Sequence, residues 1–240
     1  MTIREIKIAV ASFLNTTEAG LTINSQDLGL LAINHVRQEA EMNHNFEFGR
    51  KLATVTVNGS TGVSLDSAVV YGTATPVDIK SVIDVGYFDT NDNLRPIEWT
   101  TVAESLDRQR EDLPNFAPRY PTDGEVGITP VEGGQRILMS GSQVYLFPKD
   151  ATASVVIGME VYTFTTDWVT ANLVTEFSPW TTKGSQYLIW SSVVYLNNYF
   201  HEFLFRQEGN LPPPEKMVEK ALASFITWDA LRYEQYRRRD

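Results

Sequence analysis

The stretch KGSQYLIWSSVVYLNNYFHEFLF, residues 183–205, decides the fold of this 240-residue chain. No Gly or Pro interrupts residues 187–205, and their apolar side chains spread around most faces of a helix. A helix that is apolar on most sides is buried on most sides. We therefore predict a central helix packed by other helices, which belong either to the core of the same chain or to neighbouring subunits.

A membrane span is a poor interpretation of this stretch, because a span needs about 20 mostly apolar residues. Polar side chains interrupt the run at Ser191, Ser192, Asn197, Asn198, His201 and Glu202. Buried tyrosines and asparagines also need hydrogen-bond partners, which neighbouring protein supplies better than lipid does.

Amphipathic helices are predicted on both sides of this stretch and at the start of the chain. Apolar residues at helical spacing predict a helix over residues 3–14 and a second helix that ends near Asn45. Asn24 or Ser25 is the expected N-cap of the second helix, with Asp27 in its first turn.

The C-terminal part of the chain is also predicted to be helical. A short amphipathic piece is expected over residues 168–177, and Pro179 introduces the central helix. A final helix begins in LPPPEK, residues 211–216, since prolines suit a first helical turn and Glu215 suits the positive end of the helix dipole.

Between the helices the hydrophobic pattern changes to the alternation of strands. The clearest strand is residues 154–164, where Val155, Ile157, Met159 and Val161 point to one face. Further short strands and a hairpin are predicted over residues 51–58, 77–85, 87–99, 135–139 and 144–148. Short strands separated by turn residues at this spacing are typical of a sandwich or a small barrel.

This order of elements predicts an α+β fold. Residues 1–48 and 168–240 are expected to form one helical bundle, and residues 49–167 an inserted antiparallel β-sandwich or barrel-like region.

Composition restricts the classes of function. A net charge of −10 disfavours a protein that grips phosphate backbones, although it suits a surface that nucleic acid passes without sticking, and solubility explains it equally well. The absence of cysteine excludes disulfides, thiol nucleophiles and cysteine metal sites. Arg4, Glu5 and Lys7 interrupt the N-terminal apolar run, so we expect no signal peptide and synthesis in the cytoplasm.

Motifs of catalysis and metal binding are missing from the sequence. It contains no G-x-S-x-G, no P-loop and no G-x-G-x-x-G that opens a helix. Residues 89–93, DTNDN, are better read as a hairpin turn than as a calcium loop, and His35 as a structural residue rather than a metal ligand. We therefore expect no enzymatic activity, no cofactor and no metal.

Aromatic residues are concentrated in residues 162–205 and 225–236. Trp, Tyr and Arg are the residues that anchor protein interfaces, whereas a single core accounts for the same aromatics equally well.

The layout of the chain resembles the head-to-tail adaptor (connector, head-completion) proteins of tailed bacteriophages, particularly short-tailed ones. The stretches that carry the resemblance are IDVGYFDTNDNLRPIEW (83–99), TTVAESLDR (100–108), NFAPRYPTDG (115–124), QRILMSGSQVYLFPKDATASVVIGMEVYTF (135–164) and the helix after Pro179. VYLFP followed by a long strand is the most family-like piece.

The resemblance implies a structural virion protein without catalytic activity. It implies a dodecameric ring beneath the portal that extends the DNA channel, through which DNA passes without specific binding, and that offers an attachment surface to tail and nozzle proteins. Subunits are then expected to be monomers in the host cytoplasm that assemble on the portal, in the neck of the virion, with no membrane partner.

The residues expected at subunit or portal interfaces are Tyr187, Trp190, Tyr195, Tyr199, Phe203, Trp228, Arg232, Tyr236, Arg237, Arg238 and Arg239. Residues 232–240 are the candidate portal contact, with a frayed basic helix end as the alternative. Two other functions stay open: another tail or stopper protein of a phage, and a carbohydrate-binding β-sandwich with exposed aromatic platforms.

Overall fold

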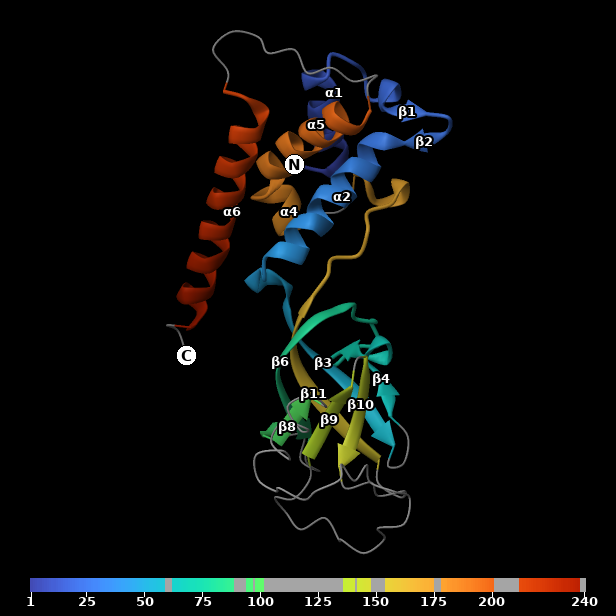
Figure 1. The fold of residues 1–240 in the computed structure, drawn as a ribbon, viewed down its shortest axis with the longest axis vertical. Coiled ribbons are helices and arrows are strands. Elements are labelled where there is room, and N and C mark those ends of the chain that lie inside the picture. Colours follow the sequence, from blue (N-terminus) through green and yellow to red (C-terminus); the bar gives the residue numbers. More distant parts are fainter. Residues whose placement is uncertain are drawn as a thin grey trace, which may run out of the picture. The chain divides into compact units, whose positions relative to one another are not determined.

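The computed structural model describes residues 1–58, 62–88, 94–96, 98–101, 136–140, 142–147, 154–174, 178–200 and 212–237. The chain divides into two compact units, one formed by Met1–Gly49 with Thr165–Asp240 and the other by Arg50–Phe164 (Figure 1). The first unit is helical and the second is built from β-sheets, which confirms the predicted α+β class.

The helical unit begins with α1, Ile3–Phe13, and α2, Leu28–Asn43. A capping box starts α1, because the Thr2 hydroxyl accepts from the Glu5 amide at 3.2 Å while the Glu5 carboxylate accepts from the Thr2 amide at 2.7 Å. The short 3₁₀ turn η1, Ala19–Leu21, follows α1.

The start of α2 differs from the prediction. Asp27 is the N-cap, and its carboxylate accepts from the Leu30 amide at 3.0 Å. Asn24 and Ser25 instead form the two-residue turn between strands β1, Thr22–Ile23, and β2, Gln26–Asp27. Both turn residues have positive φ, 49° and 66°, as a type I′ hairpin turn requires. The predicted cap was therefore wrong, because a hairpin uses the same residue types as a cap.

The C-terminal segment contributes α4, Pro179–Thr182, α5, Ser185–Tyr199, and α6, Pro214–Arg237. Every residue from Tyr187 to Val193 is buried, and α5 contacts α1, α2 and α6. The prediction of a central helix packed by other helices of the chain is confirmed.

Gly184 separates α4 from α5, which the sequence pattern does not distinguish. A Cβ atom at Gly184 would lie 3.0 Å from the Trp180 carbonyl oxygen and 3.1 Å from the Phe225 ring. A side chain at this position would therefore push α4, α5 and α6 apart.

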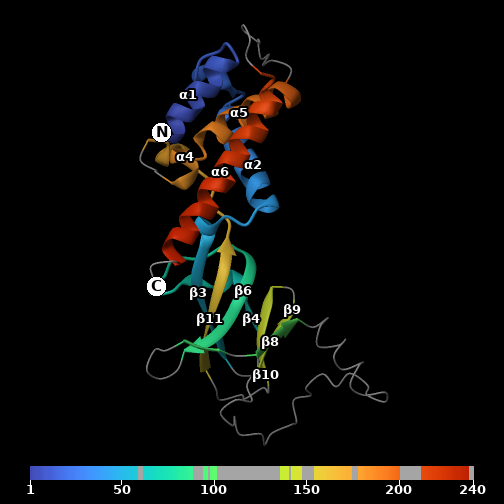
Figure 2. The same ribbon diagram turned by 90° about the vertical axis from the view of Figure 1, so that its left-hand side faces the viewer.

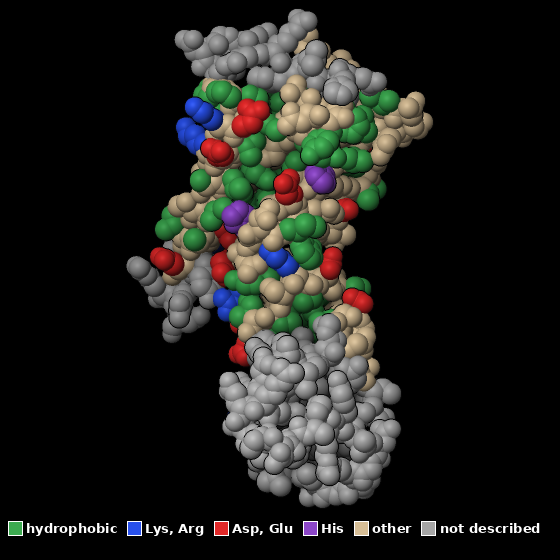
Figure 3. Space-filling model, viewed as in Figure 1, with side chains coloured by type: hydrophobic (Ala, Val, Ile, Leu, Met, Phe, Trp, Pro, Cys, Tyr) green, Lys and Arg blue, Asp and Glu red, His purple; other side chains and the backbone are tan. Residues whose placement is uncertain are grey.

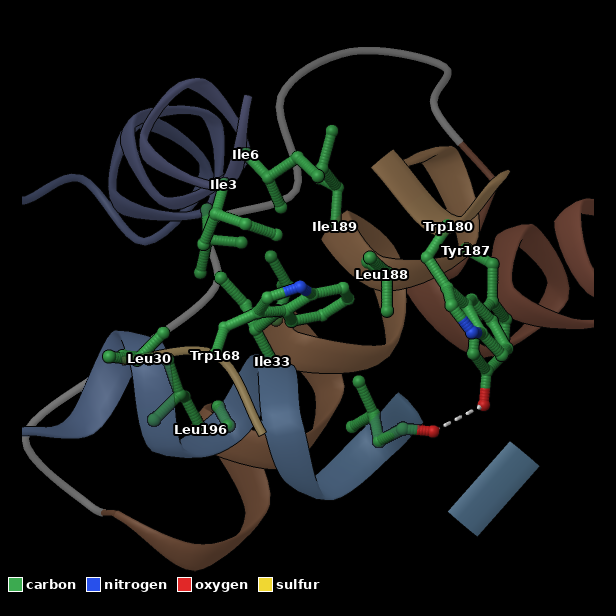
Figure 4. Packing of buried hydrophobic residues seen from close by; sticks show 14 of the residues in the cluster. Ile3, Ile6, Leu30, Ile33, Trp168, Trp180, Tyr187, Leu188, Ile189 and Leu196 are labelled. Carbon is green, nitrogen blue, oxygen red and sulfur yellow. Dashed lines mark hydrogen bonds between the residues drawn. The ribbon is translucent and has the colours of Figure 1, made fainter. Parts of the chain in front are cut away.

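The core of the helical unit lies between α1, α2 and α5 (Figure 4). The ring of Trp168 lies among apolar side chains from all three helices, and it is 2% exposed. The surrounding side chains that Figure 4 labels are Ile3, Ile6, Leu30, Ile33, Leu188, Ile189 and Leu196. The segment that carries Trp168 is thus part of the helical core.

The expected helix over residues 168–177 is not present in the described part of that segment. Residues 165–169 carry no helical turn, and only the 3₁₀ turn η4, Thr170–Asn172, follows. The contacts of residues 165–168 with α2 also place the end of the β-unit at Phe164, three residues before the predicted boundary at 167.

The β-unit contains two sheets (Figures 1 and 2). The five-stranded sheet has the order β5-β3-β11-β6-β7. Its strands are β3 Arg50–Asn58, β5 Val69–Val70, β6 Ile79–Phe88, β7 Leu94–Pro96 and β11 Ser154–Thr163. The four-stranded sheet, β4-β10-β9-β8, contains β4 Val63–Ser64, β8 Glu98–Thr101, β9 Arg136–Ser140 and β10 Gln143–Phe147.

The predicted strands over residues 51–58 and 154–164 pair antiparallel along their length, from Ser154 opposite Asn58 to Tyr162 opposite Arg50. Ile157, Met159 and Val161 are fully buried, which confirms the face assigned to them. The predicted hairpin within residues 87–99 is present as the β6–β7 pair. One pair departs from the antiparallel expectation, because β8 runs parallel to β9.

The five-stranded sheet curls on itself. The ring of Tyr71, just after β5, stacks on that of Phe88, at the end of β6, with 4.8 Å between centroids. Strands β3 and β11 lie between β5 and β6 in the sheet. In a flat sheet β5 and β6 would therefore be about 14 Å apart. Curling agrees with the predicted barrel-like region. The charged stretch over residues 101–111, whose sequence predicts a short helix, lies outside the described residues beyond Thr101.

Candidate functional site: a groove between α2, α5 and α6

A polar stripe on α2 positions the walls of the site. Asn34, Arg37, Gln38 and Glu41 follow one another at helical spacing, and all four bind residues 165–168. The Asn34 side chain pairs with the backbone of Trp168, because its oxygen accepts from the amide at 3.0 Å and its nitrogen donates to the carbonyl at 2.9 Å. Trp168 belongs to no sheet, so the Asn34 side chain supplies the hydrogen bonds that a neighbouring strand would otherwise give its backbone.

Arg37 is completely buried and continues this contact. Its guanidinium donates to the Thr166 carbonyl at 2.7 Å and to the Asp167 carboxylate at 2.5 Å. The same guanidinium lies over the Trp168 ring, 4.8 Å from its centroid. Because a buried charge is costly unless it is paired and hydrogen-bonded, these contacts explain how the cation is accommodated in the core.

Glu41 connects α2 both to residues 165–168, which we call the extended segment, and to α4. Its carboxylate accepts from the Thr165 amide at 3.1 Å, from the Thr165 hydroxyl at 2.5 Å and from the Trp180 indole at 2.9 Å. Glu41 is 4% exposed and Trp180 is fully buried. This contact sets the position of α4 against α2.

Helix α6 is held by an aromatic cluster and one carboxylate. Phe225 is its only buried apolar side chain among those described, and its ring packs on Trp180 with 4.8 Å between centroids. The other rings in the cluster are Phe46, Phe48 and Trp228. The Asp229 carboxylate accepts from the amides of Glu47 and Phe48 in the 3₁₀ turn η2, Glu47–Gly49.

Burial raises the pKa of Asp229 above its usual value of 3.8, although the hydrogen bonds from the amides of Glu47 and Phe48 counteract this. The folded protein therefore binds the Asp229 proton more readily than the unfolded chain does. Stability from this group accordingly falls as pH rises from 3.8 through the raised pKa. Relative to Asp229→Asn, which does not titrate, the natural protein should gain stability on acidification through that window.

Urea unfolding of both proteins at pH 7 and pH 4 measures this difference. We expect Asp229→Asn to be less stable by about 1–3 kcal/mol at pH 7, because one of two partly buried amides loses its acceptor. The deficit should be larger at pH 4. A deficit that shrinks on acidification would contradict the direction of the pKa shift.

A groove of about 370 Å³ lies between α2, α5 and α6, and we call it the α2–α5–α6 groove. It is lined by Val36, Glu39, Ala40, Asn43, His44, Tyr187, Ser191, Val194, Tyr195, Asn198, Tyr199, Val218 and Leu222. Helix α2 forms one wall, α5 the floor and α6 the other wall, so the contacts that fix α2 and α6 also shape the groove.

The inner end of the groove contains Tyr187, whose hydroxyl donates to the Val36 carbonyl at 3.1 Å (Figure 4). Burial raises the pKa of the Tyr187 hydroxyl above 10.0, and the charge of Glu39 raises it further. This tyrosine is therefore neutral at physiological pH and forms part of the groove floor.

The outer end of the groove is aromatic and exposed. Tyr199 is 71% exposed and packs on Tyr195 with 4.9 Å between ring centroids. Tyr195 in turn packs on the exposed His35, with 4.6 Å between centroids. Rigid amphipathic rings around an apolar hollow can bind an apolar segment of a partner with little loss of side-chain entropy.

Acidic side chains flank the groove. Glu39 lies on the α2 wall and is exposed. On α6, Glu215 and Glu219 are exposed, and helical geometry places them about 20° and 60° around the axis from the wall residue Leu222. Lys216 and Lys220 lie farther away, at about 120° and 160°. Figure 3 shows carboxylates interspersed with hydrophobic side chains over the helical unit.

The structure brings together three of the interface candidates named from the sequence, because Tyr187, Tyr195 and Tyr199 all line the groove. Trp190 does not join them. It is 5% exposed and packs on Phe13 of α1, with 4.4 Å between ring centroids, so it is not available to a neighbouring subunit.

The remaining candidates lie on α6 or outside the described part of the chain. Trp228 is half-buried against Phe225, and the exposed Arg232 lies over its ring at 5.6 Å. The side chains of Tyr236 and Arg237 are outside the described residues, although helix α6 includes both positions. Phe203, Arg238 and Arg239 are outside the described residues altogether.

Sequence reasoning missed the rest of the lining, above all Glu39 on α2 and Val218 and Leu222 on α6. A signal was present in α5, because Tyr187, Ser191, Tyr195 and Tyr199 recur every four residues and form one stripe. The contribution of α2 and α6 has no comparable signal, since it depends on how these helices pack.

Two searches of the described residues give negative results. No three His, Asp or Glu side chains in the described ranges are arranged to hold a metal ion. No helix in the same ranges is long and apolar enough to span a membrane.

No family model matches the chain, and no curated protein matches it.

Proposed function

We propose that this protein is a head-to-tail adaptor of a tailed, short-tailed bacteriophage. In this proposal twelve copies form a ring beneath the portal, extend the DNA channel and provide the surface to which tail and nozzle proteins attach. The protein is then a structural component of the virion neck and catalyses no reaction. The proposal rests on the resemblance of the chain to such adaptors together with the surface of its helical unit.

The observation that carries the proposal is the exposed aromatic end of the α2–α5–α6 groove. Tyr199 is 71% exposed beside Tyr195, above an apolar hollow. Tyrosines around an apolar hollow are typical of the hot spots of protein interfaces, the residues that contribute most of the binding energy. A ring assembled from identical subunits needs such a surface on every copy.

The charge of the chain supports the same function. A net charge of −10 suits a channel protein, because carboxylates repel DNA phosphates and allow the genome to slide.

The carbohydrate-binding alternative finds less support in the β-unit. Tyr71 is its only exposed aromatic side chain among those described, and the ring of Phe88 covers one of its faces. A sugar-binding platform needs a row of open ring faces, which the described side chains of the β-unit do not offer.

Mixing the purified protein with portal rings from the same genome tests the function. We expect the protein alone to scatter light as a monomer, and portal rings to gain a ring-shaped layer in negative-stain images. Tyr199→Ser should weaken the addition of this layer by about tenfold, because it removes an interface anchor. Tyr71→Ser is the matched control, because it removes an exposed tyrosine of the β-unit. It should leave the addition of the layer unchanged. A natural protein that stays monomeric beside portals would refute the function.

A further inference from the structure

The C-terminal end of α6 extends beyond the contacts that hold this helix. Asp229 is its last buried side chain among those described, whereas Leu231 is 54% exposed. The sequence of residues 230–240, ALRYEQYRRRD, contains four Arg, one Glu and one Asp, which gives a charge of +2 in a chain of −10. The α6 end, residues 230–240, is therefore basic in an acidic protein and presents an apolar side chain to solvent.

The α2–α5–α6 groove is complementary to the α6 end in charge and in polarity. Its floor is apolar and aromatic, and Glu39, Glu215 and Glu219 flank its walls. A basic segment with apolar side chains matches this combination, because it can bury the apolar groups in the groove while its guanidinium groups approach the carboxylates.

The α6 end cannot reach the groove of its own chain. Leu222, the groove residue of α6 nearer to this end, and Leu231 lie on the same continuous helix, 9 residues apart. At 1.5 Å per residue this separates them by about 14 Å along the axis. An occupant with this sequence must therefore come from another copy.

We propose that the α2–α5–α6 groove of one subunit binds the α6 end of a second copy of this chain. The contact joins two different surfaces, so it is heterologous and closes into a ring when the rotation between copies permits. The inference rests on the proposed adaptor function for the ring, but the contact itself can be measured without the portal. In the ring, each subunit offers its groove to one neighbour and its α6 end to the other.

Disulfide trapping tests the contact, and the chain suits it because it contains no cysteine. The double variant Asn198→Cys, Leu231→Cys places one thiol at the groove rim and one on the α6 end, both at exposed positions. The α6 end lies too far from its own groove for an intramolecular disulfide, which needs Cα atoms within about 7 Å. Mild oxidation of concentrated protein should therefore give a ladder of disulfide-linked multimers.

Single variants should give dimers at most, since one thiol cannot extend a chain. The matched control combines Asn198→Cys with Ile8→Cys, an exposed position on α1, and should give no ladder above background. Circular dichroism confirms that each variant keeps its helices. Absence of a ladder from the groove–α6 pair both in concentrated protein and on portal rings, or an equal ladder from the control pair, would overturn the inference.

Charge reversal in the double-cysteine protein tests the complementarity. Glu215→Lys with Glu219→Lys, or Arg237→Glu with Arg238→Glu, should each lower the ladder yield by about tenfold at low salt. All four changes in one chain should restore it, because the two surfaces become complementary again. Failure of the combined variant to recover would overturn the pairing.

Portal rings separate this inference from the proposed function. A ladder from a protein that ignores portals supports the contact and refutes the adaptor function. A portal-bound layer that gives no ladder when it is oxidised on the portal supports the adaptor function and overturns the contact. In that second case, portal rings that protect the thiol of the single variant Asn198→Cys from alkylation would assign the groove to the portal instead.

Discussion

Phe225→Ala is expected to lower the free energy of unfolding of the helical unit by about 3–5 kcal/mol, the usual cost of deleting a buried phenyl ring. Phe225 is 1% exposed and packs on the rings of Trp180, Phe46 and Trp228. No other buried apolar side chain of α6 is present among those described, so the cavity would form where this helix is held. The helix should therefore open locally before the rest of the unit unfolds.

Tryptophan fluorescence during urea unfolding measures this effect. Four of the five tryptophans, Trp168, Trp180, Trp190 and Trp228, belong to the helical unit, so the signal reports mainly on that unit. Hydrogen exchange of the α6 amides should accelerate in the variant. Leu231→Ala on the same helix is the control, and should change stability by no more than about 0.5 kcal/mol because Leu231 is 54% exposed. A Phe225→Ala protein within about 1 kcal/mol of the natural one would contradict the importance of this anchor.

Glu41→Ala is expected to cost about 3 kcal/mol or more, because one buried donor and two partly buried donors lose their acceptor together. The change removes the acceptor for three donors, namely the Thr165 amide, the Thr165 hydroxyl and the indole of the fully buried Trp180. A buried donor left without a partner costs about 1–3 kcal/mol, and the indole nitrogen can only donate. The hydroxyl can rotate to another acceptor, so the amide and the indole account for most of the loss.

Glu41→Gln separates hydrogen bonding from volume. Glutamine keeps one acceptor oxygen but directs an amide group at the remaining donors, so we expect roughly half of the alanine effect. Glu39→Gln, two residues earlier on the exposed face of α2, should stay within about 0.5 kcal/mol of the natural protein. Urea unfolding gives the free energies, and hydrogen exchange at residues 165–168 shows whether the extended segment is released. Equal stability of Glu41→Ala and Glu39→Gln would contradict the assigned role of Glu41.

Both predictions follow from the way in which the helical unit is assembled from the two ends of the chain. Its N-terminal and C-terminal parts are joined by contacts between residues more than 100 positions apart, such as Asn34 with Trp168 and Glu41 with Trp180. These contacts set the positions of α4, α5 and α6 against α2. The α2–α5–α6 groove therefore depends on side chains that do not line it, and variants that weaken them should also disturb binding in the groove.

The candidate site was only partly accessible to prediction. The tyrosines of α5 could be named, because Tyr and Trp anchor protein interfaces and this stretch is rich in aromatic residues. Whether each one faces the core or solvent could not be decided, as Trp190 and Tyr199 illustrate. The first packs on α1 and the second is 71% exposed, although both lie on the same aromatic helix.

By itself the sequence determined the class of fold, the order of the main helices and strands, and the central position of α5. These features follow from hydrophobic periodicity and from Pro and Gly at element boundaries, which act over a few residues. Only the tertiary structure decided that Arg37 and Glu41 face inward and that residues 165–168 are extended. The partners of these polar side chains come from a distant part of the chain, and burying them is favourable only once those partners are in place.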